Sequence, residues 1–122
     1  MIERYTRKEI KDIWEDYNRY SIWLNIELAA AEAMEKLKII PRGVAKRVRS
    51  KAKINPKRIL QIESKVKHDI IAFLTSITEK VGKEARYLHK GMTSSDVLDT
   101  CFNLQLKQSG EILLKDINHL LQ

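Results

Sequence analysis

The residues best suited to chemistry in this sequence follow a glycine, in the segment Gly91-Met92-Thr93-Ser94-Ser95-Asp96. Serine, threonine and aspartate favour the first position of a helix, so a helix is predicted to begin here. A helix start carries unpaired N–H groups and a partial positive charge, and Thr93 and Ser94 add hydroxyl donors. The segment therefore predicts a pocket for a carboxylate or a phosphate. Ordinary capping by Ser95 or Asp96 explains the same residues and is the simpler interpretation of this segment alone.

Two histidines lie at predicted helix boundaries among polar residues. His68 stands between Lys67 and Asp69, and His89 precedes Lys90 and the threonine-serine run. Histidine suits proton transfer and anion binding because its ordinary pKa, about 6.5, lies near neutrality. Asp69 could fix the tautomer of a nearby imidazole, but adjacent helical residues do not face each other, so this pair requires a bend. A structural role is the alternative for each histidine.

Arg4 and Tyr5, close to the beginning of the chain, form a third candidate. An arginine fork binds phosphate or carboxylate through two hydrogen bonds, and a tyrosine can stack or donate a hydrogen bond. The alternative is a mobile tail, the usual state of residues so close to a chain end. The three histidines and one cysteine supply no cluster for structural zinc, so no metal site is predicted.

The positive charge of the chain is concentrated in one block. The formal net charge is +7, and residues 36–62 contain ten lysines and arginines and no acidic residue. Such a block can attract anions or bind nucleic acid through its phosphates. No aromatic residue interrupts it, so it offers no platform on which bases could stack. A solvated surface is therefore the favoured interpretation, and nucleic-acid binding is disfavoured.

The composition predicts an all-α chain with one core. The 122 residues are 43% hydrophobic and 32% charged, and four glycines and two prolines leave little room for the turns of a β-rich fold. The single cysteine, Cys101, excludes a disulfide framework and fits the cytoplasm. No apolar stretch is long enough for a membrane helix, and the first residues lack the apolar run of a signal peptide.

Apolar spacing and capping residues predict helices over residues 6–16, 18–37, 44–52, 56–66, 70–81 and 97–122. Thr6 and Glu9 have the spacing of a capping box, Asn55 and Pro56 read as cap and first helical residue, and Gly82 ends a helix. The periodicity does not decide whether the chain breaks at residues 68–69. The expected apolar stripe of the second helix comprises Tyr17, Tyr20, Leu24, Leu28, Ala31, Met34 and Leu37.

The last helix is predicted to expose an apolar seam. Residues 97–122 would form a rod of roughly 39 Å. Its apolar seam continues to the final residues, and burial of this seam requires partner helices. We therefore expect residues 1–96 to form a helical domain and residues 97–122 the beginning of a longer bundle helix, in the N-terminal piece of a longer protein. A small natural protein that dimerises through this helix is the alternative. The seam comprises Phe102, Leu106, Ser109, Leu113, Ile117 and Leu120.

Three segments together resemble the first third of the adenylosuccinate lyase family, within the fumarase/aspartase superfamily. They are Met1-Ile2-Glu3-Arg4-Tyr5-Thr6-Arg7, Lys67-His68-Asp69-Ile70-Ile71-Ala72-Phe73 and His89-Lys90-Gly91-Met92-Thr93-Ser94-Ser95-Asp96-Val97. Their order and spacing match, and the helix from Trp23 to Leu37 looks similar too. The resemblance covers essentially the whole chain. It implies the N-terminal helical domain of a lyase of this superfamily, followed by the start of the first long bundle helix.

The resemblance also implies an activity and a role for each candidate residue. These enzymes cleave adenylosuccinate to AMP and fumarate, and also split the succinyl-carboxamide ribotide, by β-elimination without metal or organic cofactor. By resemblance, Thr93 and Ser94 would hold the succinyl or fumarate portion of the substrate. Arg4 and Tyr5 would contact the nucleotide, with Arg4 on its phosphate. The remaining residues would line the site in binding roles: Lys67, His68, Asp69 and His89.

Two parts of the family's active site are absent from these 122 residues. In the family, the general acid is a histidine in a second segment, and the base is a serine on a mobile loop in a third. The active sites combine residues from three subunits of a homotetramer. Another lyase of the superfamily, such as an argininosuccinate lyase, is the alternative within this resemblance. Arg4-Tyr5 and the His68-Asp69 pair favour the purine enzyme.

We predict that this polypeptide alone has no lyase activity, because the groups that transfer protons in the family lie in segments that it lacks. Fumarate release from adenylosuccinate by the purified chain should equal that of a protein-free blank. Turnover above the blank would contradict the prediction.

Overall fold

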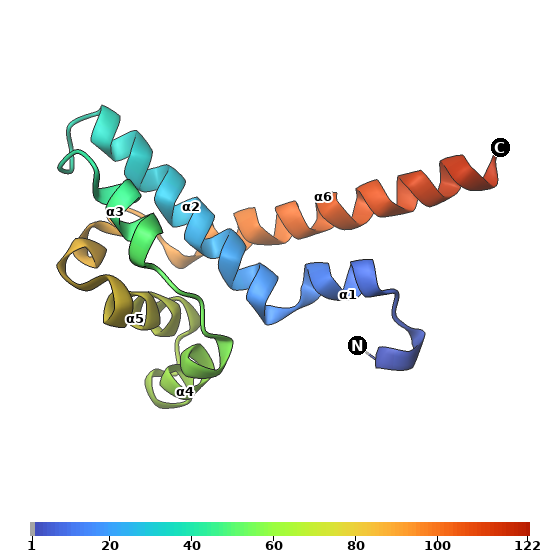
Figure 1. The fold of residues 1–122 in the computed structure, drawn as a ribbon, viewed down its shortest axis with the longest axis horizontal. Coiled ribbons are helices and arrows are strands. Elements are labelled where there is room, and N and C mark those ends of the chain that lie inside the picture. The colour runs from blue at the N-terminus through green and yellow to red at the C-terminus, as the bar shows by residue number, and fades with distance from the viewer. Residues whose placement is uncertain (1) are drawn as a thin grey trace.

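The computed structural model describes residues 2–122, and every regular element in that range is a helix (Figure 1). The all-α prediction is therefore confirmed. The α-helices are α1 (Lys8–Trp14), α2 (Asp16–Lys36), α3 (Val44–Lys51), α4 (Pro56–Val66), α5 (Asp69–Val81) and α6 (Ser94–Leu120). Two 3-10 helices accompany them, η1 (Glu3–Tyr5) and η2 (Gly82–Tyr87).

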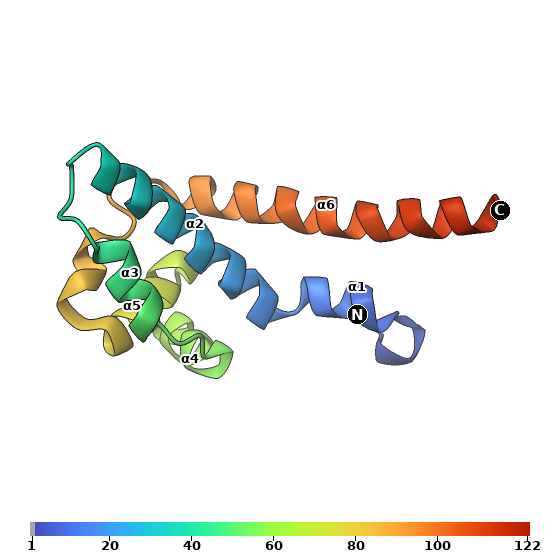
Figure 2. The same ribbon diagram turned by 45° about the horizontal axis from the view of Figure 1, so that its top comes forward.

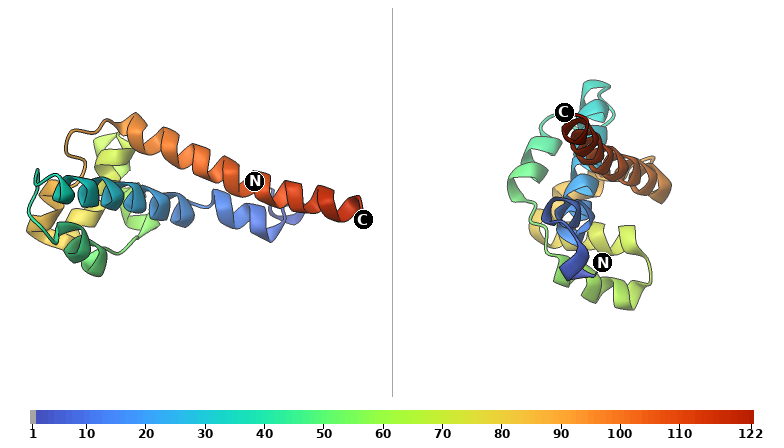
Figure 3. Two further views of the ribbon diagram at one scale, coloured as in Figure 1. Left: turned by 90° about the horizontal axis from the view of Figure 1, so that it is seen from above. Right: turned by 90° about the vertical axis from the view of Figure 1, so that its right-hand side faces the viewer.

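Helix α2 is the axis of the fold. It contacts α1, α3, α4 and α6, and its aromatic side chains reach α5. Helices α3, α4 and α5 gather around one side of it, while α6 leaves this cluster as a long rod (Figures 1 and 2). Seen from above, α2 and then α1 run along the same side of α6 (Figure 3). No helix within residues 2–122 is long and apolar enough to cross a membrane.

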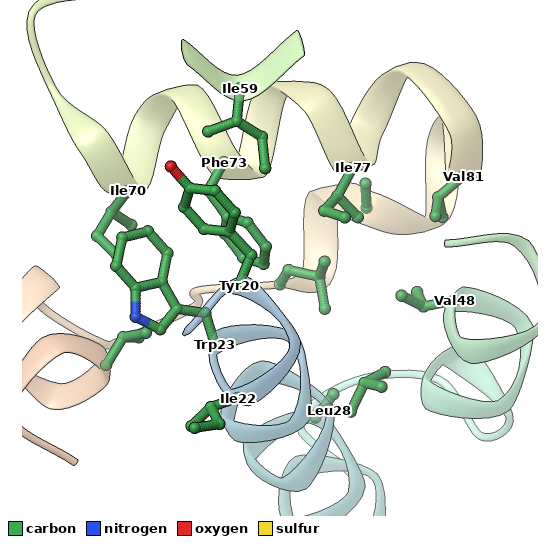
Figure 4. Packing of buried hydrophobic residues seen from close by; sticks show 14 of the residues in the cluster. Tyr20, Ile22, Trp23, Leu28, Val48, Ile59, Ile70, Phe73, Ile77 and Val81 are labelled. Carbon is green, nitrogen blue, oxygen red and sulfur yellow. The ribbon is translucent and has the colours of Figure 1, made fainter. Parts of the chain in front are cut away.

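Three aromatic rings fill the centre of the core. The Tyr20 and Trp23 side chains of α2 point toward Phe73 of α5, and Ile59 of α4 closes the cluster from the other side (Figure 4). The Trp23 ring contacts the Phe73 ring edge-on, with 5.5 Å between the ring centroids. The Tyr20 and Phe73 rings are stacked, with 6.1 Å between their centroids. Such arrangements add to the stability that burial alone provides. The core therefore fixes α4 and α5 against the first half of α2.

Local sequence signals set several helix ends where they were expected. The Asn55 side chain accepts a 3.1 Å hydrogen bond from the Arg58 N–H, and Pro56 is the first residue of α4. Lys67 adopts a left-handed conformation with φ of 56°, so the chain does break between α4 and α5. Gly82 ends α5 with φ of 77°, a conformation that glycine adopts without steric cost.

The predicted capping box at the beginning of the chain is wrong. The Thr6 hydroxyl donates a 2.8 Å hydrogen bond back to the Ile2 carbonyl, and Arg7 is the residue that precedes α1. A threonine hydroxyl can satisfy either the helix or the preceding turn, and here the η1 turn takes it. Helix α1 ends at Trp14 rather than at the predicted residue 16, because Glu15 is extended and α2 begins at Asp16.

The predicted stripe of α2 is too narrow. Tyr17 and Leu37 are exposed, whereas Trp23 and Glu27, outside the predicted stripe, are buried. Since neighbours pack on α2 from several directions, more than one face of this helix is covered.

One face of α6 packs against the rest of the chain, and another face is exposed to solvent. Val97, Cys101 and Gln105 are buried, and the Gln105 side-chain amide donates a 2.8 Å hydrogen bond to the Ile13 carbonyl beside α1. The predicted seam is exposed along its apolar positions, with Leu113 at 57%. Exposed apolar faces of this length typically pack against the helices of a partner. The exposed members of the seam are Phe102, Leu106, Leu113, Ile117 and Leu120.

We predict that Phe73→Ala lowers the free energy of unfolding by about 3–5 kcal/mol, because it opens a cavity among Tyr20, Trp23 and Ile59. Urea unfolding followed by circular dichroism measures the change. Phe102→Ala is the matched control, since Phe102 is 52% exposed. Phe102→Ala should lower the free energy of unfolding by about 1 kcal/mol or less. Equal losses in the two variants would contradict the packing in Figure 4.

A carboxylate caps α3 and makes stability depend on pH. Glu35 accepts hydrogen bonds from the Gly43 N–H at 2.9 Å and the Ala45 N–H at 2.7 Å. These backbone bonds, that of Ala45 first, hold the pKa of Glu35 below its usual value of 4.5. Because the folded-state pKa is the lower one, the contribution is present above pH 4.5 and is lost as the pH falls through the folded value.

We therefore predict that Glu35→Gln reduces the acid-induced loss of stability, because glutamine does not titrate. Thermal melts between neutral pH and the acid range below pH 4.5 test this. Glu111→Gln, an exposed position in the middle of α6, is the control and should keep the wild-type pH dependence. An unchanged pH dependence in Glu35→Gln would show that this cap does not contribute.

Candidate functional site

The segment between η2 and α6 is folded by two residues in left-handed conformations. Gly91 has φ of 70° and His89 has φ of 57°. Glycine adopts such angles freely, whereas a side chain makes them costly, so His89 needs contacts that hold it there. A 3.3 Å hydrogen bond from the Met92 N–H to the His89 carbonyl closes this turn and leads the chain to the start of α6.

Those contacts come from Glu27 of α2. Its Oε2 accepts a 2.7 Å hydrogen bond from the backbone N–H of His89, and its Oε1 lies 2.6 Å from the imidazole Nδ1. The Glu27 side chain has no accessible surface, whereas 20% of the His89 side chain stays accessible. The ring is therefore fixed at its Nδ1 edge, and part of the side chain stays accessible to solvent.

The start of α6 combines capping with exposed hydroxyl residues. Thr93 is the N-cap, and its backbone N–H donates a 2.8 Å hydrogen bond to the Asp96 carboxylate. Asp96 thus acts as a capping residue. Thr93 is exposed and Ser94 is half-buried, so both hydroxyl residues lie at the surface at the positive end of a 27-residue helix. A carboxylate or phosphate can reach this position.

His68 lies at the start of α5 and meets Asp69 across the predicted bend. Its Nδ1 accepts a long, 3.4 Å hydrogen bond from the Ile71 N–H, which makes His68 the cap of α5. The Asp69 Oδ1 lies 3.5 Å from the same nitrogen and accepts a 2.7 Å hydrogen bond from the Ile70 N–H. A nitrogen that accepts carries no proton, so neutral His68 has its proton on Nε2. Lys67 and His68 are exposed.

The predicted site residues fall into two groups within one chain. The segments that hold His68 and His89 are both fixed to α2: Ile70 packs beside Trp23 (Figure 4), and His89 binds Glu27 one turn further along. Arg4 and Tyr5 belong to η1, which lies beyond α1 and away from α3, α4 and α5 (Figures 1 and 2). There the Arg4 guanidinium lies 4.7 Å from the centre of the Tyr5 ring.

Glu27 is the residue of this candidate site to which sequence reasoning gave no role. It lies four residues after Trp23 and four before Ala31, and both of those are buried. A charged residue at that spacing is the signal that could have revealed it, since a buried carboxylate requires a partner.

Other reactive groups of the described residues offer no alternative centre. Burial raises the pKa of the Cys101 thiol, which disfavours a thiolate nucleophile. Within residues 2–122, no three histidine, cysteine, aspartate or glutamate side chains gather as metal ligands.

Comparison with known proteins identifies the class to which this fold and site belong. Residues 3–122 match the family model described as lyase, and the chain belongs to that family. It is 47% identical to the adenylosuccinate lyase of Synechocystis sp. over 122 residues, which are the whole of this chain and 28% of that protein. The resemblance to adenylosuccinate lyases is thus confirmed.

A solved structure agrees on the fold. The chain superposes on the fumarate lyase of Mesorhizobium sp. with a TM-score of 0.82 and 22% identity, over 93% of this chain and 29% of that one. The chain thus spans less than a third of the length of each of these two proteins.

Proposed function

We propose that this chain is the N-terminal, substrate-binding part of an adenylosuccinate lyase, which cleaves adenylosuccinate to AMP and fumarate and splits the succinyl-carboxamide ribotide of the same pathway. The observation that carries the proposal is the surface position of Thr93 and Ser94 at the start of α6, in a chain 47% identical to such an enzyme. The reaction requires a group that binds the carboxylate of the substrate, and a helix start with free N–H groups and hydroxyls can do so.

The reaction explains why such a feature matters. Removal of a proton next to a carboxylate places a second negative charge on that group in the transition state. Donors already aimed at the carboxylate stabilise this charge without reorganisation, which is how enzymes gain much of their rate. In this proposal, Thr93, Ser94 and the N–H groups at the start of α6 bind the succinyl portion. Lys67, His68, Asp69 and His89 line the site around it.

Arg4 and Tyr5 are proposed to bind the nucleotide, with the Arg4 guanidinium on the phosphate. Their separation from the starts of α5 and α6 within one chain fits a homotetramer whose active sites combine residues from several subunits (Figure 1). The exposed seam of α6 supports this assembly, because it supplies an apolar face for partner helices. The proton-transferring groups would come from the rest of the enzyme.

The basic block gives less support to nucleic-acid binding. Three of its arginines pair with acidic side chains from other helices or from η2: Arg47 with Glu84, Arg49 with Glu32 and Arg58 with Glu79. Arginines that are engaged in this way contribute less to a positive surface for phosphates.

A chimera tests the proposed function. We expect that these 122 residues, grafted in place of the matching region of the Synechocystis adenylosuccinate lyase, yield an enzyme that releases fumarate from adenylosuccinate. Thr93→Ala and Ser94→Ala in the chimera should each lower kcat/KM by about 10²-fold or more, because each removes a donor to the developing charge.

Thr75→Ala is the matched control, since the Thr75 hydroxyl bonds the Ile71 carbonyl within α5. It should leave kcat/KM unchanged. A chimera that assembles as a tetramer but does not turn over adenylosuccinate would contradict the proposed function. So would full activity in both hydroxyl variants.

A further inference from the structure

Within residues 2–122, Glu27 stands out as a buried carboxylate whose hydrogen bonds go to a histidine. Glu27 is 1% exposed, in the middle of α2, and both of its oxygens contact the same residue, His89. Burial of a carboxylate is costly unless hydrogen bonds compensate it. The bond from the backbone N–H holds the loop, whereas the second bond acts on the imidazole itself and so bears on the state of the ring.

We propose that Glu27 is a positioning residue, which keeps the proton of His89 on Nδ1 and turns the Nε2 edge of the ring toward the substrate. This inference deepens the proposed function and rests on it for the identity of the substrate. A carboxylate oxygen accepts, so the proton in the 2.6 Å contact lies on Nδ1. Paired carboxylates fix imidazoles in this way in catalytic sites.

The burial of the two partners decides which edge is available. Glu27 contributes no accessible surface, so the Nδ1 edge that it binds is closed to a ligand. The accessible fifth of the His89 side chain lies on its other atoms, and Nε2 is not among the buried polar atoms of the described residues that lack a partner. Four residues later the chain reaches Thr93, the cap of α6. The free edge of His89 therefore lies in the same short segment, residues 89–94, as the proposed anion-binding residues.

The two histidines consequently offer different groups to a ligand when both rings are neutral. The His68 Nδ1 accepts from the Ile71 N–H, which leaves a proton on Nε2 and makes its free edge a donor. The His89 Nδ1 donates to Glu27, which leaves Nε2 without a proton and makes its free edge an acceptor. In the proposed site, one donor edge and one acceptor edge would give the substrate a defined orientation.

Histidine tautomers measured by ¹⁵N NMR on the 122-residue chain test the proposal. At a pH at which the imidazole is neutral, we expect the hydrogen of His89 on Nδ1. In Glu27→Gln, the single side-chain oxygen should pair with the His89 backbone N–H, which can only donate. The amide NH₂ then faces Nδ1 and requires an acceptor, so the proton should move to Nε2.

Glu32→Gln is the matched control, because Glu32 lies on the same helix, loses the same charge and pairs with the exposed Arg49. It should leave the His89 tautomer unchanged. A wild-type His89 with its hydrogen on Nε2 would overturn the proposal, whether or not Glu27→Gln folds. A folded Glu27→Gln variant with an unchanged tautomer would overturn it too.

A double-mutant cycle in the chimera connects the tautomer to the reaction. We expect Glu27→Gln to lower kcat/KM by about tenfold or more, since a wrong tautomer disables an imidazole. In a His89→Ala background the same substitution should have little further effect. Equal losses in both backgrounds would mean a merely structural role and overturn the proposal. An inactive chimera whose His89 still carries its hydrogen on Nδ1 would instead contradict the proposed function.

Discussion

The arrangement of the candidate site depends on one buried carboxylate. Glu27 can lie inside the protein because His89 satisfies both of its oxygens, and His89 can keep its left-handed backbone because Glu27 binds its N–H. His89 thus offsets the unfavourable burial of the Glu27 carboxylate, and Glu27 offsets the unfavourable backbone conformation of His89. The contact fastens the segment before α6 to the middle of α2, so the start of α6 has a fixed place relative to the core.

The core around α2 gives this contact its rigidity. Tyr20 and Trp23 lock α2 to Phe73 of α5, one to two turns before Glu27, and Ile70 brings the His68 segment to the same helix (Figure 4). Both histidine segments are thus held by one continuous α-helix rather than by flexible loops. Sites supported in this way keep their geometry more closely than sites built on loops alone.

Sequence reasoning succeeded where a local signal decides the structure. Asn55 and Pro56 begin α4, Gly82 ends α5, and the seam of α6 is exposed, because capping and periodicity act within a few residues. It failed at Thr6, whose hydroxyl bonds the preceding turn instead of the helix, and where partners distant in sequence decide. The role of Glu27 is set by a residue 62 positions away. The candidate site was predictable as a set of residue types, whereas the separation of η1 from the starts of α5 and α6 required the fold.

The pairing of α2 with α6 also bears on the order in which the molecule assembles. Helices α4 and α5 are neighbours in sequence and can join early, because only a short loop must close. The Cys101 thiol and the Arg19 carbonyl are 82 residues apart, and the Gln105 amide and the Ile13 carbonyl 92. Such distant partners meet at a greater entropic cost, so we expect α6 to dock late in folding. We therefore expect the α4–α5 part of the core to form before the candidate site next to the start of α6 is complete.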